Sequence, residues 1–267
     1  MLVQGDIEDR RGAADRRGKG RRIAELAAAI EQEQVEILFQ PQFASADNHL
    51  VGAEALSRWN HPRLGRIGAE ALFDIAERSH HSAELTRHIA GRALAIAATW
   101  PEPLRLSLNV TAADLHEEGF AQVVVEAAAE AGFALDRLTL EITEQALVTD
   151  LEKGATQLEQ LARRGVRVAL DDFGAGFCNF RYLKHLPLHV LKLDRSMIQG
   201  VVDDERDLAV LRGILAMARA LDLYVVAEGI ETEEQRATIV REGCEKWQGF
   251  LGGAPMSAAE FALIALR

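Results

Sequence analysis

Residues 168–180 read VALDDFGAGFCNF, in which a short apolar run ends on the adjacent Asp171 and Asp172 and a loop with two glycines follows. Two neighbouring carboxylates repel each other unless a cation lies near them. Three interpretations are open at this point. The Asp-Phe-Gly triplet could be the magnesium-binding motif of a protein kinase, Gly174 and Gly176 could cradle a phosphate, or the aspartates could be metal ligands at the end of a barrel strand.

Short strand-like runs alternate with helical patterns on both sides of this stretch. Strands are expected at residues 36–40, 50–56, 104–109, 138–141, 166–171, 190–192, 224–228 and 246–248, with Pro41 ending the first. Helices are expected at residues 23–34, 69–77, 82–99, 120–131, 151–164, 205–221 and 232–242. This alternation is typical of parallel β-α-β units, and eight strands in a chain of 267 residues indicate a β/α barrel. No Gly-x-Gly-x-x-Gly follows the first strand, which disfavours a dinucleotide-binding sheet.

Polar residues recur at or near the C-terminal ends of seven of these strands. They are Glu54, Asn109, Glu141, Asp171, Lys192, Glu228 and Gln248. In a β/α barrel these strand ends converge on one mouth, where active sites are built. Each residue alone is as readily structural, as in an ion pair of Glu54 with Arg58, but the joint pattern favours a functional site.

The expected mouth holds five carboxylates, because Asp172 joins the four acids of the strand ends. Oxygen ligands of this kind suit Mg²⁺ or Mn²⁺, and the lack of histidine and cysteine disfavours zinc. With so many ligands, two ions are expected, which together stabilise an in-line phosphoryl displacement. Lys192 is the one cation expected in the group, suited to orienting a water or moving a proton. Asp194 lies two residues further on and so faces the same side.

Composition narrows the functional class. The net charge of −11 makes a nucleic-acid polymer an unexpected partner. Two distant cysteines, Cys178 and Cys244, argue against a disulfide framework and are compatible with the cytoplasm. No apolar run reaches the length of a membrane span. Residues 1–22, rich in arginine and glycine, are expected to form a flexible charged tail or linker before a domain at residues 23–267.

Eight ordered motifs resemble the EAL domain family, the phosphodiesterases of the bacterial second messenger cyclic di-GMP. The motifs are FQPQ at 39–42, EALSRWNHP at 54–62, SLNVT at 107–111, LEITE at 140–144, DDFGAGF at 171–177, LKLDRS at 191–196, VVAEGIET at 225–232 and QGFLGGAP at 248–255. The resemblance implies a modified TIM (β/α)8 barrel whose first strand is antiparallel. It also implies hydrolysis of cyclic di-GMP to linear pGpG with Mg²⁺ or Mn²⁺.

The resemblance implies a role for each matching residue. The implied metal ligands are Glu54, Asn109, Glu141, Asp171, Asp172 and Glu228. Lys192 matches the lysine that orients or deprotonates the attacking water, and Gln248 matches a residue that contacts a water of the metal centre, so the implied catalytic set is Lys192, Glu54, Glu228 and Gln248. Gln40, Arg58 and Asp194 match positions that contact the substrate. Glu144 matches a glutamate that orders the loop after the strand at 138–141.

Partners and departures follow from the same resemblance. A homodimer and an upstream sensory or GGDEF domain are expected. In the loop after Asp172, Ala175, Cys178 and Asn179 replace the usual threonine and serines, which bears on turnover or dimer strength. Met197 replaces a usual phenylalanine, which is expected to be a packing exchange.

Two alternatives to an active phosphodiesterase stay open, and the kinase interpretation does not. Family members that have lost activity serve as cyclic di-GMP receptors. A Schiff-base lyase or aldolase barrel would use Lys192 as its nucleophile, although the surrounding carboxylates would keep that amine protonated. The kinase interpretation fails because the chain has no HRD-type catalytic loop and no glycine-rich ATP loop.

Overall fold

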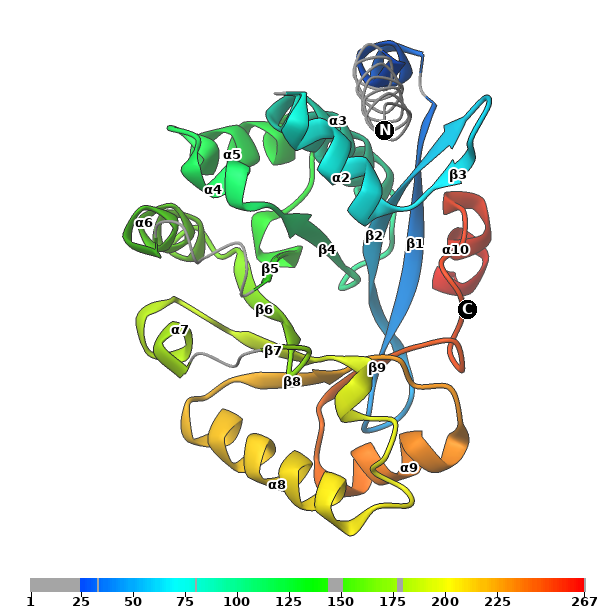
Figure 1. Cartoon of the computed structure of the whole chain (residues 1–267), viewed down its shortest axis with the longest axis vertical. Helices are drawn as coiled ribbons and strands as arrows, with labels where there is room; N and C mark the ends of the chain where they lie inside the picture. The colour runs from blue at the N-terminus through cyan, green and yellow to red at the C-terminus, as the bar shows by residue number, and fades with distance from the viewer. Residues whose placement is uncertain (1–24, 33, 80, 144–150, 177–179, 267) are drawn as a thin grey trace, which may run out of the picture. The chain divides into compact units, whose positions relative to one another are not determined.

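The computed structural model describes residues 25–32, 34–79, 81–143, 151–176 and 180–266 (Figure 1). The chain divides into two compact units. The first contains the residues up to Glu36 together with Ser57–His88, and the second contains Ile37–Leu56 together with Ile89–Arg267. The tail expected at residues 1–22 lies outside the described residues, so the boundary between it and a domain at 23–267 stays a prediction.

The first unit has its own small apolar core at the far end of a long strand, β2 (Leu50–His61). The end of β2 pairs antiparallel with β3 (Gly65–Ile67), with Trp59 opposite Ile67. Trp59 is fully buried, and the His61 ring beside it lies 3.0 Å from a carboxylate oxygen of Glu25. The other apolar side chains without exposed surface in this unit are Leu26, Ala29, Val35, Leu72, Ala76 and Leu85.

The second unit contains the barrel. The sheet runs in the order β1-β9-β8-β7-β6-β5-β4-β2, and a pairing of β1 with β2 closes it. Neighbours from β2 round to β9 are parallel, whereas β1 runs antiparallel to β9. The modified TIM barrel with an antiparallel first strand is therefore confirmed. The remaining strands are β1 (Val35–Ala44), β4 (Arg105–Val110), β5 (Leu138–Thr143), β6 (Arg167–Phe173), β7 (Val190–Leu193), β8 (Tyr224–Ala227) and β9 (Lys246–Gln248).

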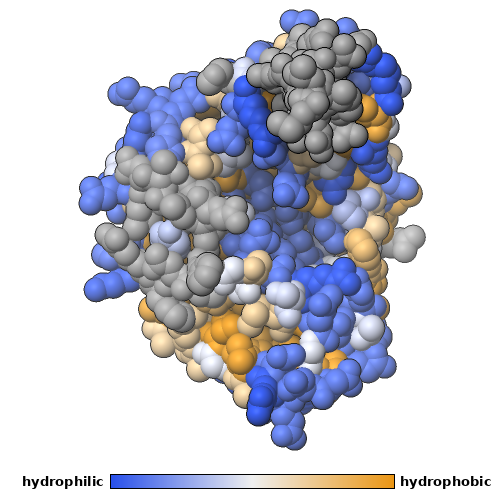
Figure 2. Space-filling view, viewed as in Figure 1, coloured by the Kyte–Doolittle hydropathy of each residue, from blue (hydrophilic) through white to orange (hydrophobic). Residues whose placement is uncertain are grey.

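Helices lie between the strands along the chain, and a final helix follows β9. They are α2 (Ala69–Arg78), α3 (Ser82–Ala97), α4 (Ala112–His116), α5 (Phe120–Ala131), α6 (Leu151–Ala162), α7 (Phe180–His185), α8 (Glu205–Ala220), α9 (Glu233–Glu242) and α10 (Ala258–Ala265). Figure 2 shows a patch of hydrophobic surface in the lower part of the view. In Figure 1, which has the same orientation, β8 and α8 lie in this region. Among the described residues, no helix is long and apolar enough to cross a membrane.

The structure corrects two strand boundaries. Pro41 does not end the first strand, because β1 continues to Ala44. On its β9 side, Pro41 lies between the bridge of Phe39 to Met256 and the β9 pairing that begins at Gln42, so its missing N–H costs no hydrogen bond there. The second strand is longer than expected, so Glu54 lies in the middle of β2 rather than near its end.

Candidate functional site: an acidic cluster around Lys192

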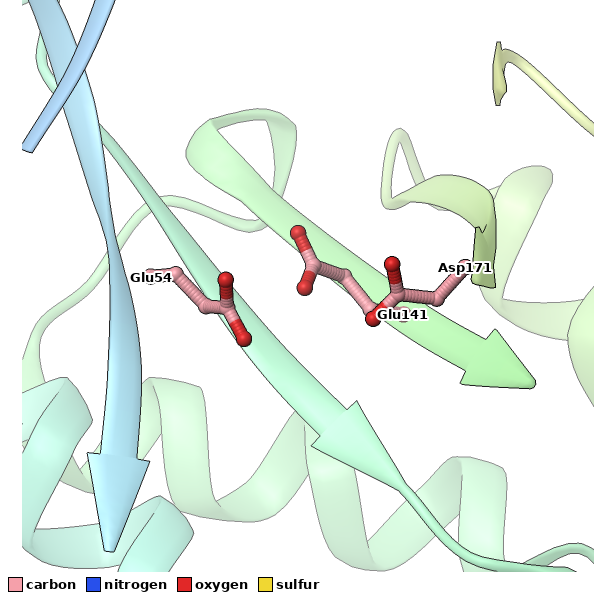
Figure 3. A group of neighbouring side chains, drawn as sticks. All are labelled: Glu54, Glu141 and Asp171. Carbon is pink, nitrogen blue, oxygen red and sulfur yellow. The ribbon is translucent and has the colours of Figure 1, made fainter. Parts of the chain in front are cut away.

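Four strands of the barrel direct their acids to one interior space. Figure 3 shows Glu54 on β2, Glu141 on β5 and Asp171 on β6, with their carboxyl groups directed toward one another. On each strand, alternate side chains point into the barrel, and these acids occupy inward-pointing positions. Glu228 follows β8 directly and joins them.

Lys192 on β7 lies at the centre of this cluster. Its Nζ is 2.6 Å from Glu141 Oε2, 2.7 Å from Glu228 Oε1, 3.0 Å from Asp171 Oδ1 and 3.4 Å from Glu54 Oε2. The lysine side chain is 1% exposed, so one buried ammonium group is shared by four carboxylates. The sequence-predicted acids and lysine are thus brought together in a single network.

Amide side chains hold Glu54 in place from two sides. Asn109 Nδ2 donates to Glu54 Oε1 at 2.8 Å, and Gln248 Nε2 donates to Glu54 Oε2 at 2.7 Å. Gln42 Nε2 in turn donates to Gln248 Oε1 at 2.9 Å. Sequence reasoning missed Gln42, although its spacing of two from Gln40 placed both side chains on one face of β1.

Asp171 and Asp172 reach the same cluster because the backbone departs from a regular strand between them. Successive side chains of a strand normally point to opposite faces. Here Asp172 has φ +56°, and the pairing of β6 with β7 shifts register between Leu170 and Phe173. A left-handed conformation is uncommon for a residue other than glycine, and aspartate is among those that tolerate it best.

Burial and repulsion raise the pKa values of most of these carboxyl groups. Burial, supported by the charges of the other acids, raises the pKa of Glu141 well above its usual value and that of Asp171 less far. Burial also raises the pKa of Glu228 to about 8, and burial together with the charge of Asp171 raises that of Asp172 to about 6. The positive charge available in the protein is therefore too small for five carboxylates.

Glu54 and Lys192 are instead both held in their charged forms. Burial opposes the charge of Glu54, but Lys192 and the amide donors outweigh it and lower the pKa of that carboxyl. Burial also opposes the charge of Lys192, yet the surrounding acids raise its pKa well above the usual value. Lys192 is thus firmly protonated, which speaks against its use as a Schiff-base nucleophile.

The donor set fits hard divalent cations. One ligand oxygen from each of Glu54, Glu141 and Asp171 lies within 4.8 Å of the others, and the same holds for Asp171, Asp172 and Glu228. All donors are oxygens, which Mg²⁺ and Mn²⁺ prefer. Because Asp171 belongs to both groups, the cluster could hold two ions.

The remaining predicted residues lie in different places. Asp194 caps the turn Arg195–Met197 by accepting from Ser196 N at 2.9 Å, and its charge helps to raise the pKa of Asp172. Gln40 is half-buried on β1. Arg58 belongs to the first unit, where its Nη1 donates to the Ser57 carbonyl at 2.7 Å. Glu144, Cys178 and Asn179 lie outside the described residues, whereas Ala175 is exposed.

The sequence of this chain is similar to those of several bacterial signalling proteins. Cyclic di-GMP phosphodiesterase NbdA of Pseudomonas aeruginosa is 36% identical over 88% of this chain and 30% of its own length. The bifunctional diguanylate cyclase/cyclic di-GMP phosphodiesterase MucR of the same organism is 33% identical over 89% of this chain and 35% of its own. The chain therefore spans about a third of the length of such curated relatives.

Solved structures give the same result. The structure described as the PaMucR phosphodiesterase in complex with c-di-GMP superimposes with a TM-score of 0.83 at 33% identity, covering 89% of this chain and 98% of that one. The EAL domain family matches residues 23–255, which is most of the sequence. With its motifs, its barrel and this match in agreement, the chain belongs to the EAL domain family.

Proposed function

We propose that this chain is a metal-dependent phosphodiesterase that hydrolyses cyclic di-GMP to linear pGpG. The observation that carries the proposal is the cluster itself, in which carboxylates from four different strands share one buried ammonium group and still lack positive charge. The relative NbdA, a cyclic di-GMP phosphodiesterase, and the PaMucR complex with c-di-GMP supply the substrate class.

The proposed reaction is a simple hydrolysis. The oxygen of a water molecule forms a bond to one phosphorus of the cyclic dinucleotide, and the P–O3′ bond at that phosphorus breaks. The product carries a 5′-phosphate at one end and a free 3′-hydroxyl at the other. Mg²⁺ or Mn²⁺, held by Glu54, Asn109, Glu141, Asp171, Asp172 and Glu228, would activate the water and neutralise charge on the phosphoryl group.

The chain's own residues would do the rest. Lys192 keeps its proton at Nζ, so it stabilises negative charge that develops on the phosphoryl oxygens and orients the water. Asn109 and Gln248 fix both oxygens of Glu54, which prevents rotation of that carboxylate. Arg58, as a guanidinium, suits a phosphate oxygen of the substrate, and Gln40 and Asp194 are proposed as further contacts.

Chromatography of the products tests the proposal directly. Protein treated with EDTA, then supplied with Mg²⁺ or Mn²⁺, is incubated with cyclic di-GMP. We expect pGpG after metal is restored and intact substrate before. Binding without turnover over hours would support a receptor instead, and absence of binding would overturn the substrate assignment. Trapping with borohydride and a carbonyl compound would support the lyase alternative.

Assembly and location stay predictions. A homodimer is proposed from the family resemblance alone. An upstream sensory or GGDEF domain is proposed because this chain matches about a third of the MucR relative, which is named a bifunctional diguanylate cyclase/cyclic di-GMP phosphodiesterase. A cytoplasmic location is likewise proposed, on the basis of the family's signalling role.

A further inference from the structure

Three cations lie at the starts of barrel strands, at the opposite end from the acidic cluster. Arg105 opens β4, Arg167 opens β6 and Lys246 opens β9. Parallel strands begin at one end of a barrel and finish at the other. These residues therefore gather at the N-terminal end of the barrel.

The side chains of these cations share the inner face of the barrel. Arg105 is four residues from Asn109, Arg167 is four from Asp171, and Lys246 is two from Gln248. Residues separated by an even number along a strand share a face. Because Asn109, Asp171 and Gln248 contact the cluster inside the barrel, the cations on the same strands point inward as well.

Apolar and aromatic side chains accompany Arg167 on β6 and lie on the next two strands, β7 and β8. Ala169, Val190 and Val226 form a buried cluster on β6, β7 and β8. The Arg167 guanidinium lies over the ring of Tyr224 at 5.6 Å from its centroid, which links β6 to β8. Tyr224 is 49% exposed, so the ring in this contact is accessible to solvent.

The three cations have too little negative charge around them. Within the described parts of the chain, no carboxylate lies within ion-pair distance of Arg105, Arg167 or Lys246. Nε and Nη2 of Arg105 are buried, and neither has a hydrogen-bond acceptor among the residues that the structure describes. Leaving such donors unsatisfied is costly, and buried donors without a partner call for an explanation.

The pKa values of two of these cations are lowered, as expected where positive charges lie near one another. Burial and then the charges of Arg105 and Arg167 lower the pKa of Lys246 to about 8, against a partial opposing effect of Glu141 in the acidic cluster. Burial and then the charge of Arg167 lower the pKa of Arg105 to about 10, against a partial opposing effect of the exposed Asp136. The cations therefore lie close enough to repel one another, in a chain whose net charge is −11.

We propose that Arg105, Arg167 and Lys246 form a binding site for a phosphate group at the N-terminal end of the barrel, separate from the acidic cluster. The two guanidinium groups offer paired N–H donors that match the oxygens of a phosphate, and the ammonium adds a third positive charge. Inorganic phosphate and the phosphate of a monoester share this chemistry.

Calorimetry on the full chain tests the site. The protein is kept in EDTA, so that no metal is present at the acidic cluster, and is titrated at constant ionic strength with sodium phosphate or with guanosine 5′-monophosphate. We expect one anion to bind per chain. A nucleotide that binds at least tenfold more tightly than phosphate would identify a monoester as the ligand, and equal affinities would identify the free anion.

Matched variants decide whether these residues form the site. Arg105→Gln and Lys246→Gln should each weaken phosphate binding at least tenfold. Lys246→Arg should keep the phosphate affinity within threefold of the wild type. Arg163→Gln, at an exposed position between α6 and β6, should leave that affinity unchanged. Absence of phosphate binding in the wild type at 10 mM, or unchanged affinity in both glutamine variants, would overturn the proposal. Circular dichroism confirms that each variant is folded before titration.

Discussion

The adjacent Asp171 and Asp172 serve one cluster only because a single backbone angle redirects the second side chain. In a regular strand one carboxylate would point inward and the other outward. The positive φ of Asp172 and the shifted register of β6 against β7 bring both groups within 4.8 Å of Glu228. The arrangement concentrates charge that only cations can offset.

Metal affinity should depend on pH through these acids. The pKa of Asp172 is raised to about 6 and that of Glu228 to about 8, so both groups bind protons at acidic pH. Mn²⁺ binds the ionised carboxylates and competes with these protons. Its affinity for metal-free protein should therefore rise with pH through about 6 and again through about 8. Calorimetry at pH 5.5, 7 and 8.5 measures this.

Asp172→Asn serves as the matched variant, because asparagine also tolerates a left-handed backbone. It should lose the lower pH step and retain the upper one. Equal Mn²⁺ affinity of the wild type at pH 5.5 and 8.5 would contradict the account.

Removal of Lys192 should destabilise the metal-free protein. Lys192→Met leaves Glu54, Glu141, Asp171 and Glu228 without their shared cation, and breaking a buried ionic network typically costs about 3–5 kcal/mol. The loss in free energy of unfolding should become smaller toward pH 5, because the acids with a raised pKa are neutral there. Urea unfolding at pH 8 and pH 5 measures both values, with the exposed Lys184→Met as control. Equal stability of Lys192→Met and the wild type at pH 8 would refute the network's importance.

At the scale of secondary-structure elements, tight turns after the strands keep the side chains of the acidic cluster in position. Gly229 follows Glu228 with φ +66°, and a Cβ there would lie 2.5 Å from Cγ of Arg195. Gly249 follows Gln248, and a Cβ there would lie 2.1 Å from the carbonyl oxygen of Ile230. Site residues thus stand directly before turns that have no room for a side chain.

Gly229→Ala should lower both stability and activity. Alanine strains the left-handed backbone at a cost of about 1–3 kcal/mol and displaces Glu228 through contact with Arg195. Gly213→Ala is the control, since Gly213 lies in α8 with open space around it and should gain about 1 kcal/mol from better helix propensity. Thermal unfolding and initial rates measure both. A Gly229→Ala variant with wild-type stability and rate would contradict this account of the turn.

The sequence predicted the alternation of strands and helices correctly. It predicted the end of each strand less accurately. Helix α5 was predicted at its observed bounds, and the spacing of polar residues predicted which acids meet. Pro41 was misread as a strand end because the tertiary pairing that makes it harmless comes from Met256, far along the chain. Helix α10 was missed, although Ser257 and Glu260 carry a capping-box signature.

Two further features of the site depend on contacts between strands. The redirection of Asp172 depends on the register of β6 against β7, which is a tertiary property. Gln42 could have been found from its spacing to Gln40, but its contact with Gln248 depends on the antiparallel pairing of β1 and β9.

At the scale of the whole molecule, the barrel separates charges of opposite sign along its interior. The acids and Lys192 lie toward the C-terminal ends of the strands, whereas Arg105, Arg167 and Lys246 lie at the starts of their strands. If the charged ends act as separate sites, a substitution at one should leave ligand binding at the other unchanged. The acidic end then carries the proposed activity alone.

The most direct measurement of the central claim is the initial rate of pGpG formation by Glu54→Gln with saturating Mn²⁺. Glutamine removes a metal ligand and faces the donors of Asn109 and Gln248 with a donor of its own. We expect a rate reduced about a hundredfold or more, while the exposed Glu205→Gln control keeps the wild-type rate. Formation of pGpG by Glu54→Gln at the wild-type rate would contradict the assignment of the acidic cluster as the hydrolytic centre.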